Sequence, residues 1–360
     1  MVIGMRIGID LGGTKIEAVG MDPMGEVRGK IRVSTPDNYE KVIDSIVSMV
    51  GRMEDKVGKI DAVGIGTPGA IDPETGLVKN AYNTALQGRP FADDIGKRLT
   101  LPVRVANDSN CFALSEATDG AGSGGRVVFG VILGTGVGGG VVVDGKLIGG
   151  INGIAGEWGH NPLPGARDDE LPGPQCTCGR RGCIEAFLSG PALQRDHESR
   201  TGDAISAARL AERAGAGDEA CLATLEIYGD RLARALASAI NFLDPNFIVL
   251  GGGVSQIPEI YRLVRAKWGE HVFSETVKTK LLPNRFGDSS GVRGAAWLWS
   301  MDEIQEFRRE RDRKLEEAAK AAKEAEAAED TSDEASDDEQ SSEEPDASRE
   351  GEGADESSAT

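Results

Sequence analysis

The 360-residue sequence lacks three features that mark common classes of protein. It has no run of 18 apolar residues, so we expect no transmembrane helix. Its start, MVIGMRIGIDLGG, lacks the charged, apolar and cleavage regions of a signal peptide in that order, which predicts a cytoplasmic protein. It also has no GxxxxGK[ST] motif, and this absence excludes a P-loop nucleotide site.

A dinucleotide site is excluded for a different reason. Residues 64–69 and 134–139 both match the pattern GxGxxG, but that pattern predicts such a site only between a strand and a helix. Residues 141–143, all valine, favour a strand after the second match. Pro68 and Pro73 break any helix after the first match.

The negative charge is concentrated at one end of the chain. The net charge is −19, and residues 302–360 contain 23 acidic and 8 basic residues, a net of −15. The rest is near neutral, which argues against nucleic-acid binding. Residues 301–330 are rich in Ala, Glu, Lys and Arg and predict a charged helix, whereas residues 331–360 predict an acidic, disordered segment. We interpret this tail as solubilising, with binding to basic partners as the alternative.

Two segments of the chain repeat one pattern. Residues 7–20 (IGIDLGGTKIEAVG) and 129–143 (FGVILGTGVGGGVVV) each contain an apolar strand, a glycine-rich turn with a threonine and a second apolar strand. Such turns present successive N–H groups to anionic oxygen. We therefore expect the two hairpins to hold a polyphosphate from both sides, with Asp10 holding Mg²⁺ at the end of the first strand. Simple tight turns are the alternative.

The remaining pattern predicts two α/β lobes with mixed sheets. Strands are expected at residues 3–11, 15–21, 27–33, 61–66, 103–107, 127–133, 141–144 and 247–250. Helices are expected after an N-cap at Asp37, just after Asp108, and over residues 219–243, 257–268 and 290–300. The lobes would span residues 1–118, closed by a helix at about 288–301, and 119–287. Since ligands bind at the carboxyl ends of strands, Asp10, Asp108, Gly134 and Gly251 predict an inter-lobe cleft.

The segment CTCGRRGC predicts a metal site. Cys176, Cys178 and Cys183 lie within eight residues, and His160 precedes them by sixteen. Three thiolates and one imidazole are typical of a structural, tetrahedral Zn²⁺. No CxxC redox pair is present, and surface thiols or a disulfide are the alternative. The two other cysteines lie in apolar helical settings and are expected in the core.

Three carboxylates are candidates for chemistry. Glu157 and Glu185 flank the ligands of the predicted zinc ion, which would bring them toward one pocket where they could bind the hydroxyls of a sugar. Two surface glutamates are the alternative. Asp108 lies between a strand and a helix, where it would suit a general base in phosphoryl transfer. The same position also suits a helix N-cap, and spacing alone leaves both interpretations open.

Together these segments resemble the ROK family of bacterial sugar kinases and repressors. The resemblance runs from about Arg6 to Trp299, and the tail has no counterpart. It rests on IDLGGTK, GIGTPG, VANDSNC, LGTGVGGG, GIAGEWGH, CTCGRRGCIE and VLGGGVS. It implies a two-lobed actin-like ATPase (ribonuclease H-like) fold with an inter-lobe cleft, ATP with Mg²⁺, and a homodimer.

The resemblance also implies a role for individual residues, with Asp108 as the catalytic base. The sugar would be bound by Asn107, Asp108, Glu157, His160, Glu185 and Gly69, with His160 turned to zinc. The segment KNAYN departs from the family, so Asn80 or Asn83 would take one sugar contact. Nucleotide and Mg²⁺ would be bound by Asp10, Gly12, Gly13, Thr14, Lys15, Gly134, Thr135, Gly136, Gly251, Gly252 and Gly253.

Within this family, the segments NPLP and GDSSGVRGAAWLW look most like fructokinases of the mannose/fructose type. We therefore expect ATP-dependent phosphorylation of the 6-hydroxyl of fructose, or of mannose. Kinases of N-acetylglucosamine or glucose are the alternative. A sugar-responsive repressor is a remote alternative, since it would carry a helix-turn-helix ahead of a hairpin that here begins by Met5. A non-catalytic sugar-binding protein is another, and the retained Asp10 and Asp108 argue against it.

Overall fold

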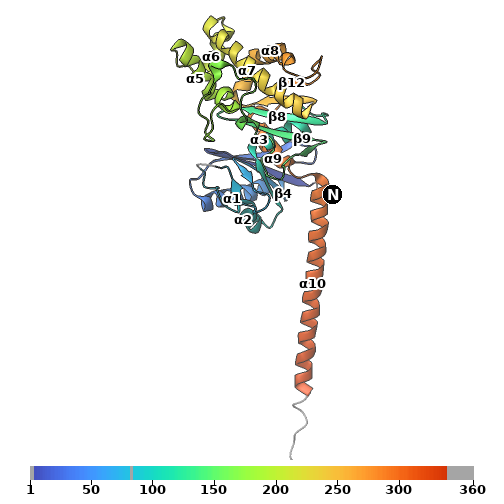
Figure 1. The fold of residues 1–360 in the computed structure, drawn as a ribbon. Coiled ribbons are helices and arrows are strands. Elements are labelled where there is room, and N and C mark those ends of the chain that lie inside the picture. Colours follow the sequence, from blue (N-terminus) through green and yellow to red (C-terminus); the bar gives the residue numbers. More distant parts are fainter. Residues whose placement is uncertain (1–3, 82–83, 339–360) are drawn as a thin grey trace, which may run out of the picture. The chain divides into compact units, whose positions relative to one another are not determined.

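A computed structural model describes residues 4–81 and 84–338 of the chain. The chain divides into two compact units, residues 1–304 and 305–360. Figure 1 shows that the first unit contains two sheets with helices around them. The expected sugar contact Asn83 lies outside the described residues.

The first sheet contains the first glycine hairpin. Its strands lie in the order β3-β2-β1-β4-β7, with β1 antiparallel to β2 and parallel to β4. The strands are β1 (Met5–Leu11), β2 (Lys15–Met21), β3 (Val27–Ser34), β4 (Ile60–Thr67) and β7 (Val103–Asn107). A separate small hairpin is formed by β5 (Ala70–Ile71) and β6 (Val78–Lys79).

The second sheet repeats this topology. Its order is β10-β9-β8-β11-β12, with β8 antiparallel to β9 and parallel to β11. The strands are β8 (Val127–Leu133), β9 (Val137–Val143), β10 (Lys146–Leu147), β11 (Phe247–Gly251) and β12 (Lys280–Pro283). In both sheets the first strand is central. On one side of it each strand pairs antiparallel with its neighbour, and on the other side each strand pairs parallel with its neighbour. The expected repeat and the expected mixed sheets are therefore confirmed.

Helices cover the outer faces of both sheets. The first is α1 (Tyr39–Val57), whose buried residues include Val42, Ile43, Ile46 and Val50. Its N-cap is Asn38 and not Asp37, because the Asn38 side chain accepts the Glu40 N–H at 2.9 Å. The others are α2 (Phe91–Leu99), α4 (Ile184–Leu188), α5 (Gly190–Thr201), α6 (Ala207–Gly215), α7 (Glu219–Leu243) and α8 (Pro258–Lys267).

One strand begins earlier than expected. Residues 141–144 were predicted as a strand after a glycine-rich turn, but β9 starts at Val137. Its glycines pair with β8, as Gly138 does with Ile132 and Gly140 with Gly130. Gly138 and Gly140 have no side chain, and this lets helix α3 (Asp108–Thr118) pack closely on the strand, as described below.

Two helices cross between the sheets, α3 (Asp108–Thr118) and α9 (Ser290–Trp297). Helix α3 follows β7 of the first sheet but packs against β8 and β9 of the second. Helix α9 follows β12 of the second sheet but packs against β1 and β4 of the first. The two helices also pack extensively against each other, and Figure 1 shows both in the middle of the first unit.

Glycines permit this central packing. A Cβ atom added to Gly64 of β4 would overlap the Ala295 carbonyl oxygen, and one added to Gly294 of α9 would overlap the Cys111 carbonyl oxygen. The helices therefore approach the sheet and each other through bare backbone. The buried Glu116 of α3 adds a polar link, since its carboxylate accepts the Ser290 hydroxyl at 2.7 Å and the Ala121 N–H at 2.8 Å.

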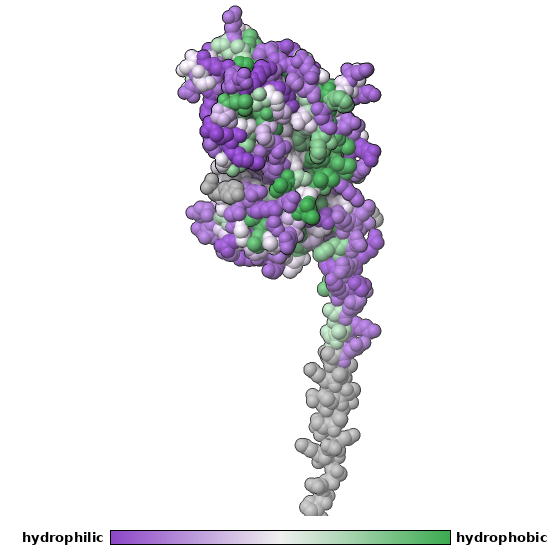
Figure 2. Space-filling model, in the orientation of Figure 1, coloured by the Kyte–Doolittle hydropathy of each residue, from purple (hydrophilic) through white to green (hydrophobic). Residues whose placement is uncertain are grey.

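The charged C-terminal segment begins as the long helix α10 (Met301–Asp338). It continues eight residues beyond the predicted end at residue 330, and it contains the i,i+4 ion pair Lys314–Glu310 at 2.8 Å. Figure 2 shows mostly hydrophilic residues along its coloured part. Among the described helices, none combines the length and the apolar content needed to cross a bilayer. The lobe boundaries at residues 118 and 288–301 stay predictions.

The glycine contacts yield a testable prediction. We expect Gly64→Ala to lower the free energy of unfolding by about 1–3 kcal/mol or more, because the Ala295 backbone has to move away. Gly51→Ala is the matched control, since an added Cβ on this exposed residue of α1 meets nothing within 4 Å. It should raise stability by up to about 1 kcal/mol. Urea unfolding measures both, and equal stability of the two variants would contradict the prediction.

Candidate active site

The carboxyl ends of the parallel strands β1, β4 and β7 bring several polar residues of the candidate site together. Asp10 near the end of β1 pairs in register with Gly66 of β4, and Thr67 of β4 pairs with Asn107 of β7. Asp108 then begins α3. The expected proximity of Asp10 and Asp108 agrees with the electrostatics, because the Asp108 carboxylate contributes to the raised pKa of Asp10, and both carboxylates raise the pKa of the Cys111 thiol.

Asn107 and not Asp108 caps helix α3. The Asn107 Oδ1 accepts the Ser109 N–H at 2.9 Å, and its Nδ2 donates to the Gly69 carbonyl at 2.9 Å. The Asp108 Oδ1 accepts the Ser109 N–H at 2.6 Å and the Ser109 hydroxyl at 3.2 Å. Within the described residues the Asp108 Oδ2 has no hydrogen-bond partner. The capping role is therefore filled by a neighbour, and one carboxylate oxygen of Asp108 is available for chemistry.

Burial makes both aspartates more basic than usual. It raises the pKa of Asp108, although the hydrogen bonds from Ser109 oppose the rise. It also raises the pKa of Asp10 from its usual 3.8 to about 6, with further contributions from Asp108 and Glu17. A carboxylate with a raised pKa accepts a proton more readily near neutral pH, which suits a general base.

The first glycine hairpin is open to a ligand at its tip. A Cβ added to Gly13 would meet nothing within 4 Å. The turn is closed by the Gly12 N–H, which donates to the Lys15 carbonyl at 3.0 Å. The Thr35 hydroxyl, a contact that the sequence did not indicate, donates to the Gly12 carbonyl at 2.7 Å and fixes the turn from the neighbouring strand.

The glycines of the second hairpin divide into two groups. At the tip, a Cβ on Gly134 would meet only an Ile132 methyl group at 3.7 Å, so this residue is open to a ligand. Further along, a Cβ on Gly138 would overlap the Ser109 hydroxyl of α3. A Cβ on Gly140 would lie 2.8 Å from the Ala113 Cβ. The tip alone therefore fits phosphate binding, and the later glycines let α3 approach the sheet.

The glycines after β11 also differ from one another. Gly251 lies against the ring of Phe112, and Gly252, at φ 82°, lies against the Leu133 carbonyl, so neither has room for a side chain. An added Cβ on Gly253 would meet nothing within 4 Å. Of the three residues expected near adenosine, Gly253 is the one with open space beside its backbone. A role in binding adenosine stays a prediction for all three.

The Glu157 carboxylate lies near the carboxylates of Asp108 and Glu185. Burial raises the pKa of Glu157, His160 opposes the rise, and the nearby Asp108 and Glu185 carboxylates add to it. The Glu185 Oε2 accepts the Val137 N–H at 3.0 Å, which places this carboxylate beside the second hairpin. Both glutamates are half-buried, which argues against two unrelated surface residues, and their contact with a sugar stays a prediction.

Two other expected sugar contacts lie on the small hairpin. Asn80 has a left-handed backbone, with φ 58°, just after β6. Gly69 has φ 81°, and its carbonyl is the one that binds Asn107. A Cβ on Gly69 would overlap the Lys79 carbonyl, so a glycine is needed where these segments meet. Contact of either residue with a sugar stays a prediction.

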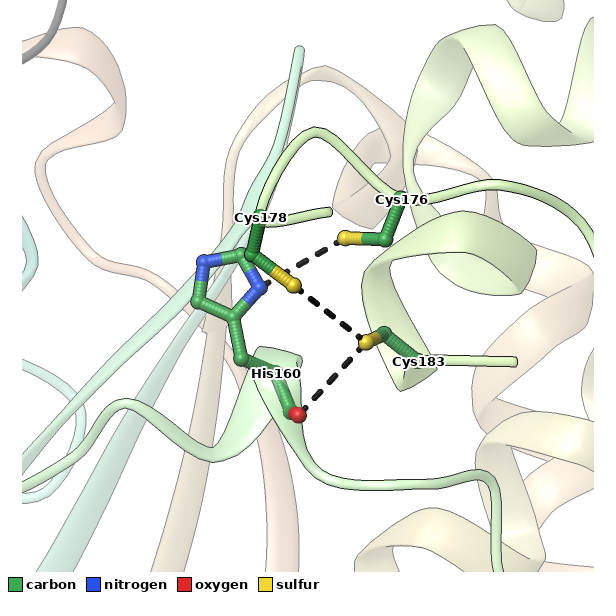
Figure 3. Close-up of side chains that lie close together, drawn as sticks. All are labelled: His160, Cys176, Cys178 and Cys183. Carbon is green, nitrogen blue, oxygen red and sulfur yellow. Dashed lines mark hydrogen bonds between the residues drawn. The ribbon is translucent and has the colours of Figure 1, made fainter. Parts of the chain in front are cut away.

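The four expected metal ligands come together (Figure 3). Their ligand atoms all lie within 4.8 Å of one another. The His160 Nδ1 is 3.6 Å from the Cys176 Sγ, and the Cys178 and Cys183 sulfurs are also 3.6 Å apart. A tetrahedral Zn²⁺ with bonds of about 2.0–2.3 Å holds its ligands about 3.5–3.8 Å apart. All five cysteines are free, so the donor set fits zinc and no disulfide is formed.

The raised pKa of Asp10 leads to a prediction about stability. Because the folded protein binds this proton more tightly than the unfolded chain, the contribution of Asp10 to stability falls as the pH rises from 3.8 to about 6. We expect Asp10→Asn to raise the free energy of unfolding of the ligand-free protein by about 1–3 kcal/mol at pH 7. The gain should shrink toward pH 4. Urea unfolding at both pH values measures it, and a variant less stable than the wild type at pH 7 would disprove it.

The metal site generates a second prediction. We expect about one zinc ion per chain, loss of that ion in Cys178→Ser, and a lower melting temperature after treatment with a strong chelator. Cys221→Ala is the control and should keep its zinc, because Cys221 is buried in α7, outside the four-residue cluster. Metal analysis and thermal unfolding test this, and a wild-type protein without zinc would refute it.

The comparisons with known proteins agree with this geometry. The family model described as the ROK family matches residues 6–302. An N-acetyl-D-glucosamine kinase of Pectobacterium atrosepticum is 38% identical over 303 residues, covering 83% of this chain and 100% of the relative. One of Photobacterium profundum is 36% identical over 299 residues, covering 82% and 99%.

Solved structures also match. A ROK hexokinase from Thermus thermophilus has a TM-score of 0.74 and 32% identity, covering 83% of this chain and 98% of that one. A ROK family glucokinase from Streptomyces griseus, solved with glucose and AMPPNP, has a TM-score of 0.68 and 31% identity, covering 82% and 99%. These matches confirm the expected actin-like α/β fold, and the chain belongs to the ROK family.

Proposed function

We propose that the chain is an ATP-dependent sugar kinase that phosphorylates N-acetyl-D-glucosamine. The observation that carries the proposal is the half-buried Asp108 at the start of α3, with one carboxylate oxygen that has no hydrogen-bond partner among the described residues. Asp108 lies close to Glu157, which in turn lies close to Glu185, and the glycine hairpins of both sheets have open tips. Kinase activity is also what the names of the ROK relatives indicate.

The choice of sugar differs from the expectation. The segments NPLP and GDSSGVRGAAWLW favoured fructose or mannose, but the curated relatives of 36–38% identity over nearly their whole length are N-acetyl-D-glucosamine kinases. The first segment follows Trp158–His160, and the second includes α9. The fructose and mannose assignment is therefore unsupported, and the alternative is favoured.

The proposed reaction is in-line phosphoryl transfer. Asp108 accepts the proton of the sugar hydroxyl, whose oxygen forms a bond to the terminal phosphorus of ATP as the bond to ADP breaks. Asn107, Glu157 and Glu185 would orient the sugar, and residues 12–15 and 134–136 would hold the phosphates. Asp10 would hold Mg²⁺, which offsets charge on the phosphates when bound. Zinc, with four protein ligands, would fix His160 and the adjacent loop.

Other readings have less support. A ROK transcriptional regulator shares the fold with a TM-score of 0.73, but at 24% identity this likeness carries no function. A non-catalytic sugar-binding protein is also less supported, because Asp10, Asp108 and both glycine hairpins are retained. The homodimer implied by the resemblance stays a proposal, and light scattering against the mass of 37.9 kDa per chain decides it.

One experiment tests the function and the base together. ADP release is measured for the wild type and Asp108→Asn with N-acetylglucosamine, glucose, mannose and fructose. We expect N-acetylglucosamine to give the highest kcat/KM, and Asp108→Asn to lose about 10²–10⁴ in kcat while keeping its melting temperature. Fructose as the best substrate would restore the first expectation. Near-normal turnover in the variant would remove Asp108 from its role.

A further inference from the structure

The Glu185 carboxylate joins two segments that the sequence keeps apart. Its Oε2 accepts the Val137 N–H of the second hairpin at 3.0 Å, and its Oε1 accepts the Thr177 hydroxyl at 2.9 Å. Thr177 lies between Cys176 and Cys178 in the cysteine-rich loop. One carboxylate therefore connects the candidate metal site to the turn that we propose holds the phosphates.

The chain makes room for this connection. A Cβ on Gly136 would lie 2.6 Å from the Glu185 Oε2, so a side chain at this position would displace the carboxylate. The same turn is held at its other end by the Gly190 N–H, which donates to the Gly134 carbonyl at 2.8 Å. Helix α4 therefore holds the hairpin through Glu185, and helix α5 holds it through Gly190. Of these two residues, Glu185 is the one that also contacts the cysteine-rich loop.

The loop has a defined shape that sets the position of Thr177. The Cys176 N–H donates to the Arg180 carbonyl at 2.8 Å, and the Gly179 N–H donates to the Cys176 carbonyl at 3.1 Å. Gly179 has φ 86°, which a residue with a side chain rarely adopts. Since Cys176 and Cys178 would be held by the ion, the Thr177 hydroxyl can bind Glu185 only while the loop keeps this shape.

We propose that Thr177 is a positioning residue that couples the metal site to nucleotide binding. Its hydroxyl orients Glu185, Glu185 holds the Val137 N–H, and this contact sets the hairpin tip for phosphate. The proposal rests on the proposed function, because it takes residues 134–136 as the phosphate site. Loss of either the hydroxyl or the metal then weakens nucleotide binding even when no sugar is present.

Three variants of the full chain separate this role from simple packing. Thr177→Val keeps the shape of the side chain and removes the donor, whereas Thr177→Ser keeps the donor. Thr201→Val is the matched control, because Thr201 is also an exposed threonine whose hydroxyl donates a hydrogen bond, to the His197 carbonyl at 2.8 Å. Titration calorimetry with MgADP in the absence of sugar gives the dissociation constant, and metal analysis gives the zinc content of each protein.

We expect Thr177→Val to weaken MgADP binding about 3–10-fold, which corresponds to the loss of one hydrogen bond. Thr177→Ser and Thr201→Val should stay within about 2-fold of the wild type. Removal of zinc by a chelator should weaken MgADP binding to the wild type to a similar extent. It should have little further effect on Thr177→Val, because both changes break the same connection between the metal site and Glu185. Amide hydrogen exchange at Val137 should become faster in Thr177→Val, and this readout holds even if the variant changes its zinc content.

Two outcomes would overturn the proposal, and they differ in meaning. Wild-type MgADP affinity and unchanged exchange at Val137 in Thr177→Val would refute the coupling alone and leave the kinase assignment intact. A wild-type protein that binds no MgADP would refute the proposed function, and the coupling with it.

Discussion

The contact between helices α3 and α9 is the constraint on which the rest of the first unit depends. It is a contact of backbone with backbone, because a Cβ at Gly294 of α9 would overlap the Cys111 carbonyl of α3, and α9 approaches β4 in the same way at Gly64. This close approach places the start of α3 beside the end of β1. Asp10 and Asp108 therefore share one buried region, although 97 residues separate them in the chain.

The chemistry follows from that burial. Moving a carboxylate away from water disfavours its charged form, and both aspartates have raised pKa values for this reason. The unfavourable free energy of desolvating these carboxylates is offset by apolar contacts elsewhere in the fold, including those of the fully buried Ile7, Ile9 and Ile65 of the first sheet. A site prepared in this way is less stable without its ligands than an uncharged site would be, and binding of a cation would remove that cost.

The sequence predicted the parts whose signal is local. The first glycine hairpin, the cysteine cluster and helix α7 were found where they were expected, whereas the second strand of the second hairpin begins earlier, at Val137. The role of Asp108 was left open between general base and helix cap, and only the side-chain geometry assigns the cap of α3 to Asn107. Gly138 and Gly140 were taken as turn residues because nothing in a single sequence reveals a helix that packs on them from a distant segment. Thr177 carries no motif of its own, and its contact with Glu185 depends on the folded loop.

The exchange of helices between the sheets also has a consequence for synthesis on the ribosome. The strands of the first sheet are complete at Asn107, but the helix that covers one of its faces ends at Trp297. At roughly 5–20 residues per second, about 10–40 s pass before that helix has been made. During this interval the nascent chain presents an uncovered apolar surface, so chaperones that recognise such surfaces have their main opportunity before α9 emerges.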